Sequence, residues 1–211
     1  MPATVESLVD AATEQWVTWG RSTWNVATGA KSIGHTDDEV AFARLVIEQY
    51  CAVGGGNPSV TDIADDRYFW SAVGMSAAMK SAGFTKTEFP FAQSHSTFIR
   101  HFVAARKRGI ESAPYWGFRL NEPGGEPQPG DIVAYARARN MTTERAAKLF
   151  DATNSYESHS DLVVERRRNE IDVIGYNVMD SVTKKTLPLG ANGHIADPRH
   201  FWFVTLEHRG G

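Results

Sequence analysis

The hydrophobic pattern of this 211-residue chain changes its period once, near residue 115. Before that point apolar residues recur at intervals of three and four, which is typical of helices that bury one face. After it, short runs rich in Val, Ile, Tyr and Phe are separated by Gly, Pro and Asn, which is typical of strands. A run of helices followed by a run of strands predicts an α+β domain.

The first part of the chain predicts four helices, each followed by glycine, the residue that most often ends a helix. They cover about residues 4–19, 40–53, 70–82 and 94–108. Thr36 and Glu39 have the spacing of a capping box and predict the start of the second helix. Residues 21–35, between the first two helices, are predicted to form a surface loop.

The second part predicts a sheet of five or six antiparallel strands, against which the N-terminal helices pack. The predicted strands cover about residues 115–120, 131–135, 161–165, 171–178, 182–187 and 201–206. Residues 136–158 form an insertion loop with one short helix near 143–150. We expect a single domain over residues 1–211, in which residues 1–35 are an N-terminal helix and loop extension. Long loops often carry function, so both loops are of interest.

The composition excludes several classes of protein. Hydrophobic and charged fractions of 42% and 22% are near globular averages, which excludes an intrinsically disordered chain. No apolar run approaches the roughly 20 residues of a membrane span. The net charge of −3 gives no bias toward nucleic acid, and the arginine run 166–168 is typical of a solvated strand end. We therefore expect neither a membrane span nor a nucleic-acid partner.

Residues 1–19 carry three acidic side chains and lack the basic start and apolar run of a secretory signal. This pattern leaves two expectations for location: the cytoplasm, or export by a route without a classical signal peptide. The single cysteine, Cys51, excludes a disulfide within the chain and a cysteine-based zinc site. Its apolar neighbours on the second helix predict a buried structural thiol.

We expect no metal and no cofactor. His95 and His101 are six residues apart on one predicted helix, about 240° around its axis, so they cannot chelate one ion together. The sequence has no HExxH motif. Its glycine run 54–56 follows a helix rather than a strand, which is the wrong context for a phosphate-binding loop.

Three residues predict hydrolytic chemistry. Ser71 lies at the start of the third helix, where the backbone dipole stabilises a developing negative charge. His159 opens a strand, and Asn177 interrupts the next apolar strand. In a hydrolase, Ser71 would be the nucleophile, His159 the base and Asn177 the group that orients the imidazole. The alternative for Ser71 is that it only caps its helix.

Three further residues are candidates for supporting roles in the same cleft. Asp161 is two residues from His159, so both side chains face the same side of a strand, and Asp161 is the alternative orienting group. His95 begins the fourth helix, and Trp70 directly precedes Ser71.

The order and spacing of several short motifs resemble the bacterial family DUF2272, over about residues 14–203. The motifs are Trp70-Ser71-Ala72, Ser94-His95-Ser96, Pro129-Gly130-Asp131, His159-x-Asp161-Leu162-Val163 and Gly175-x-Asn177-Val178-x-x-Ser181-Val182. That family is in turn similar to the papain-like amidases and peptidases of the NlpC and CHAP type, many of which act on peptidoglycan.

The resemblance implies a papain-like fold with Ser71 at the position of the nucleophilic cysteine, His159 at the histidine and Asn177 at the third residue. Ser71 departs from that pattern, because a hydroxyl has a far higher pKa than a thiol and needs a base to take its proton. The resemblance implies a hydrolase of amide bonds in bacterial cell-wall peptide. Two alternatives stay open: a catalytically silent module that binds a glycan, a peptide or a protein partner, and a serine esterase.

Overall fold

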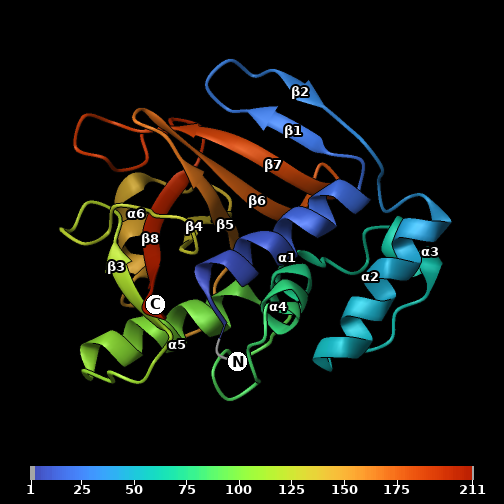
Figure 1. The fold of residues 1–211 in the computed structure, drawn as a ribbon, viewed down its shortest axis with the longest axis horizontal. Helices are drawn as coiled ribbons and strands as arrows, with labels where there is room; N and C mark the ends of the chain where they lie inside the picture. The colour runs from blue at the N-terminus through green and yellow to red at the C-terminus, as the bar shows by residue number, and fades with distance from the viewer. Residues whose placement is uncertain (1–2, 211) are drawn as a thin grey trace.

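The structure is a computed structural model that describes residues 3–210, which form six helices and eight strands (Figure 1). The helices are α1 (Val5–Thr18), α2 (Val40–Val53), α3 (Val60–Ala64), α4 (Ser71–Ser81), α5 (His95–Lys107) and α6 (Thr143–Leu149). The strands are β1 (Ser22–Asn25), β2 (Lys31–Ser32), β3 (Tyr115–Arg119), β4 (Ile132–Ala136), β5 (Ser158–Arg166), β6 (Glu170–Val178), β7 (Ser181–Pro188) and β8 (Phe201–His208).

All eight strands belong to one sheet, in the order β2-β1-β7-β6-β5-β4-β8-β3. The α+β class is confirmed, but the expectation of five or six antiparallel strands was wrong. Residues 21–35, expected to be a loop, supply β1 and β2, and β1 pairs with β7 in parallel. The sequence does not reveal these two strands because they are short and lie at the sheet edge, where ladder hydrogen bonds suffice without an apolar face.

Helices α1, α4 and α5 pack against one face of the sheet, and α2 and α3 lie beyond α4, away from the strands (Figure 1). Helix α4 is buried on all sides from Ser71 to Met79. Its small residues permit this position: a Cβ at Gly74 would come within 2.6 Å of the ring of Tyr176 on β6. The close contact fixes the start of α4 over the middle of the sheet.

The opposite face of the sheet carries a second, smaller apolar cluster. Its buried members include Val133, Tyr135, Val163, Val173, Leu187 and Trp202. Both faces of the central strands are therefore covered, which explains why β4 is buried along its whole length.

Cys51 is exposed, which corrects the expectation of a buried thiol. Helix α2 buries Ala43, Val46, Tyr50 and Val53. Cys51 follows Tyr50 by one residue, about 100° around the helix, and so faces away from the core. Within residues 3–210, no helix is both long enough and apolar enough to cross a membrane.

Candidate active site

Ser71 is the first residue of α4 rather than its cap. The N-cap is Trp70, whose side chain makes no capping hydrogen bond. The alternative that Ser71 serves only as a helix cap is therefore wrong. The first N–H groups of an α-helix lack intrahelical acceptors, so the start of α4 presents backbone donors beside the Ser71 hydroxyl.

The hydroxyl of Ser71 forms a hydrogen bond with His95, the first residue of α5. The distance from Ser71 Oγ to His95 Nε2 is 2.8 Å. The other ring nitrogen, Nδ1, lies 2.7 Å from the hydroxyl of Ser160 on β5. All three side chains are buried, and Ser71 is 7% exposed. Because both ring nitrogens are bonded, the imidazole plane of His95 is fixed between the two hydroxyls.

A second histidine lies next to this group. Nε2 of His159 is 3.2 Å from Oδ1 of Asp161, and Oδ2 of Asp161 is 2.7 Å from Nζ of Lys185 on β7. Lys185 and Asp161 are fully buried. A Cβ at Gly175 of β6 would lie 2.0 Å from Asp161 Oδ1, so only glycine leaves room for this carboxylate.

The two histidine rings are neighbours, with centroids 5.1 Å apart. Side chains alternate along a strand, so β5 directs Ser160 toward the helices and Asp161 toward the opposite face of the sheet. The ring of His159 also lies 5.2 Å from that of Tyr135. Strand β5 thus contacts both histidines: the hydroxyl of Ser160 bonds to His95, and the carboxylate of Asp161 bonds to His159.

Burial favours the neutral form of both histidines. It lowers the pKa of His95 well below its usual value, and the neighbouring His159 lowers it further, while Asp161 acts in the opposite direction. Burial also lowers the pKa of His159 against the pull of Asp161. Neutral His95 can accept a proton from Ser71, as a general base must.

The buried ion pair behaves differently. Burial alone would raise the pKa of Asp161, but Lys185 and His159 together hold it below its usual value. Burial would lower the pKa of Lys185, but Asp161 raises it. Both groups are therefore charged at neutral pH, and each neutralises the other inside the sheet.

The structure separates some of the residues that the sequence groups together. Ser71 bonds to His95, the expected supporting residue, and not to His159, the expected base. Asp161, not Asn177, contacts the imidazole of His159. Asn177 has φ of 52° and lies at an irregularity of the β6–β7 ladder, so the strand alternation that would aim it at His159 ends before it.

Trp70 holds the start of α4 in place. Its indole Nε1 donates to Oδ2 of Asp37 over 2.6 Å, and its ring stacks on Trp19 with centroids 4.9 Å apart. Burial raises the pKa of Asp37 to about 6, although the bond from Trp70 opposes that shift. Trp70 therefore supports Ser71 through the backbone rather than through contact with the hydroxyl.

Sequence reasoning missed Ser160 and Lys185. Lys185 shares a face of β7 with Leu187, since the two are two residues apart, and a lysine in an apolar row is a signal for a buried partner. Ser160 gave only a weak signal, as a small polar residue between His159 and Asp161.

Three cavities of about 770, 510 and 320 Å³ lie elsewhere on the molecule, and Ser71, His95 and His159 line none of them. In the part of the chain that the structure describes, no group of three or more His, Cys, Asp or Glu side chains could hold a metal ion.

Comparison with protein families gives a match. A family model described as "Uncharacterized protein conserved in bacteria (DUF2272)" matches residues 22–208, from the first residue of β1 to the last of β8. No curated protein and no solved structure matches significantly.

Proposed function

The chain belongs to the DUF2272 family, and from that premise and the geometry of the site we propose that it is a serine hydrolase. Ser71 is the nucleophile and His95 the general base. One observation carries the proposal: the 2.8 Å hydrogen bond between Ser71 Oγ and His95 Nε2 at the start of a buried helix. A hydroxyl in this setting has both a base and a row of backbone donors beside it.

The proposed reaction uses these groups in sequence. Neutral His95 takes the Ser71 proton at Nε2 while Oγ attacks the carbonyl carbon, and the first N–H groups of α4 stabilise the negative oxygen that forms. The imidazolium then donates the proton to the leaving group, and an acyl-serine remains. Water, deprotonated by His95, attacks the acyl-serine and releases the acid and the serine hydroxyl.

Ser160 fixes the ring of His95 where a carboxylate stands in a Ser-His-Asp triad. A neutral hydroxyl orients the ring but adds no negative charge. In this proposal Asp161 in the adjacent site acts in the same direction as a triad carboxylate, since it raises the pKa of His95, while its partner Lys185 opposes the effect.

For the substrate we propose amide bonds of bacterial cell-wall peptide. The support is the sequence resemblance to the NlpC and CHAP type, in which a nucleophile at a helix start faces a histidine on a strand; the base proposed here, His95, lies instead on helix α5. Here the buried helix α4 contacts β5 and β6, the strands of His159 and Gly175. Esters that offer the same carbonyl chemistry are the simpler substrates of such a site.

A second candidate function is a catalytically silent binding module. The observation that favours it is access: Ser71 is 7% exposed, and it lines none of the three cavities described above. In that case the Ser71–His95 bond would only hold α4 and α5 together.

The test measures turnover of purified peptidoglycan and of an activated ester by the wild type and by Ser71→Ala. It also measures labelling of Ser71 by a fluorophosphonate, read by peptide mass spectrometry. We expect labelling at Ser71 and a loss of at least about 10³-fold in kcat/KM for Ser71→Ala. Unchanged turnover in Ser71→Ala would show that Ser71 is not the nucleophile. A wild-type protein that shows neither turnover nor labelling, but that sediments with insoluble peptidoglycan, would favour the binding module.

A further inference from the structure

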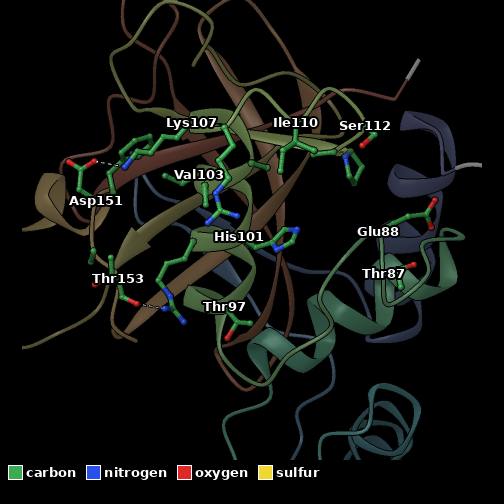
Figure 2. A pocket seen from close by; sticks show the side chains of 18 residues that line it. Thr87, Glu88, Thr97, His101, Val103, Lys107, Ile110, Ser112, Asp151 and Thr153 are labelled. Atoms are coloured by element: carbon green, nitrogen blue, oxygen red, sulfur yellow. Dashed lines mark hydrogen bonds and ion pairs between the residues drawn. The ribbon is translucent and has the colours of Figure 1, made fainter.

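The largest of the three cavities is a groove along the outer face of α5, with a volume of about 770 Å³. Figure 2 shows α5 between the segment of Asp151 and Thr153 on one side and that of Thr87 and Glu88 on the other. Ile110 and Ser112 close a third side. None of its lining residues belongs to the Ser71 site.

The periodicity of α5 creates this groove. Thr97, Arg100, His101, Ala104, Lys107 and Arg108 recur at intervals of three and four, and all line the cavity. The other side of the helix, with Phe98 and Phe102, is buried against the sheet. Small side chains at Thr97 and Ala104 leave a hollow, and cationic side chains flank it.

The positive charges of the groove are only partly neutralised. Arg100 donates to the backbone carbonyls of Ser96 and Thr153, which carry no net charge. Arg108 has no ion pair in the described range 3–210. Lys107 pairs with Asp151, but that carboxylate also binds Arg119.

The single carboxylate at the far side, Glu88, is already engaged. It accepts hydrogen bonds from the backbone N–H and the hydroxyl of Thr85, which lower its pKa. The α5 side of the groove therefore keeps uncompensated positive charge, at Arg100 and Arg108.

The floor of the groove is apolar. Val103 and Ala104 form it on α5, and Ile110, 39% exposed, and Phe150 line its sides. An inorganic anion gains nothing from contact with apolar side chains, whereas an apolar side chain of a peptide can bury them. The volume is in the range of sites that hold small ligands, roughly 300–1,000 Å³.

We propose that this groove binds a short acidic peptide in an extended conformation. Guanidinium groups match carboxylates with paired N–H donors. Arg108, the C-cap of α5, follows Arg100 by eight residues, so their Cα atoms are separated by about 12 Å along the helix axis. An extended peptide rises about 3.3 Å per residue, so carboxylates four residues apart reach both arginines and face the same side. An apolar residue midway between them lies over Ala104.

The experiment uses fluorescence anisotropy with the full-length protein and the labelled pentapeptide Glu-Ser-Leu-Ser-Glu. Its matched controls are Gln-Ser-Leu-Ser-Gln and Lys-Ser-Leu-Ser-Lys. We expect the acidic peptide to bind at least about ten-fold more tightly than the glutamine peptide, and to weaken as salt screens the contact. Equal binding of all three peptides would overturn the proposal.

Two variants test charge and shape separately. Arg108→Glu reverses an exposed charge that has no ion pair, and we expect it to weaken the acidic peptide about ten-fold or more. Ala104→Phe fills the hollow without a change of charge and should also abolish tight binding. Arg44→Glu makes the same charge reversal on the exposed side of α2, outside the groove, and should leave binding unchanged. An equal loss in Arg44→Glu would show a nonspecific charge effect and contradict the proposal.

One competitor and one further variant complete the test. Inorganic phosphate should displace the peptide no better than chloride at the same ionic strength. Displacement by phosphate at a lower concentration than chloride would show that the groove is a phosphate site and contradict the peptide proposal. Ser71→Ala should keep the peptide affinity of the wild type, because the groove is separate from the active site. A loss of binding in Ser71→Ala would show that the peptide occupies the Ser71 site and contradict the groove.

Discussion

The two faces of β5 hold two histidine sites of opposite electrical character. On the helix side, His95 lies between two neutral hydroxyls, those of Ser71 and Ser160. On the other side, His159 contacts a carboxylate that is itself paired with a fully buried ammonium group. The comparison teaches that a nearby carboxylate does not identify the histidine next to the candidate nucleophile: His95, which contacts Ser71, is the one without an acidic partner.

The largest expected difference between the two sites is in catalysis. His95→Gln removes the proposed base and should lower kcat/KM by about 10³-fold or more, because general base and nucleophile act as a unit. His159→Gln should lower it far less, since no hydrogen bond joins His159 to Ser71 in the described residues. Steady-state kinetics of the two variants on one activated ester decides the comparison. A larger loss in His159→Gln would return the role of base to His159.

The second prediction concerns the stability of the carboxylate side. Lys185→Met leaves Asp161 charged, buried and without its cation, which should lower the free energy of unfolding by about 3–5 kcal/mol. The matched control is Lys184→Met, the adjacent lysine, whose ammonium lies 4.0 Å from the centroid of the Trp16 ring. The control should cost only about 1 kcal/mol, as for an exposed cation–π contact. Equal losses of the free energy of unfolding in urea for the two variants would show that the ion pair with Asp161 contributes no more than the contact of Lys184 with Trp16.

A smaller effect on stability is expected from a substitution at Gly175, the residue of β6 against which the carboxylate of Asp161 packs. Gly175→Ala would place a methyl group 2.0 Å from Asp161 Oδ1 and should destabilise the protein by about 1–3 kcal/mol. In an Asp161→Ala background the same change should cost much less, because the crowded oxygen is gone. A double-mutant cycle by thermal unfolding measures this coupling. Strict additivity would contradict the contact.

The smallest expected effect is a shift in pH dependence. The proposed mechanism needs neutral His95, and burial lowers the pKa of that imidazole, so the fall of kcat/KM on acidification should begin well below pH 6.5, the pKa of an ordinary histidine. Asp161 raises the pKa of His95, so Asp161→Asn should move this fall to still lower pH. A pH–rate profile of wild type and variant measures both. A shift toward higher pH would mean that Asp161 does not act on His95 through its charge.

The same property links the histidines to stability. A histidine whose pKa is lowered on folding binds fewer protons in the folded state, so its contribution is present above the unfolded value of about 6.5 and is lost as pH falls through the folded pKa. Both His95 and His159 act in this direction. The fold should therefore lose stability on acidification in the range where the ordinary histidine begins to titrate.

The sequence predicts much of the fold because its long elements carry strong periodicity. Helices α1, α4 and α5 and the central strands lie within a few residues of their predicted bounds. The short strands β1 and β2 are missed because their side chains have no common apolar face. The parallel pairing of β1 with β7 is also absent from the local pattern, since it joins residues about 160 positions apart.

The sequence predicts which residues belong to the candidate site better than it predicts which of them contact one another. Ser71, His95, His159 and Asp161 all carry local signals, such as a helix start or a strand entrance. Which histidine meets Ser71 depends on how α4 and α5 are set on the sheet, and that is decided by contacts such as Gly74 on Tyr176. Asn177 was placed wrongly for a local reason. Its backbone has a positive φ at an irregularity of the β6–β7 ladder, and the sequence alone does not distinguish it from a regular strand residue.

The parallel pairing of β1 with β7 has a consequence for how the protein is made. During synthesis, β1 and β2 emerge early and can form their hairpin, but β1 finds its second partner, β7, only after residues 181–188 have left the ribosome. Until then the edge of β1 that later pairs with β7 is open, and an unpaired strand edge invites association with other chains. The newly made protein therefore depends on its last strands to protect its first.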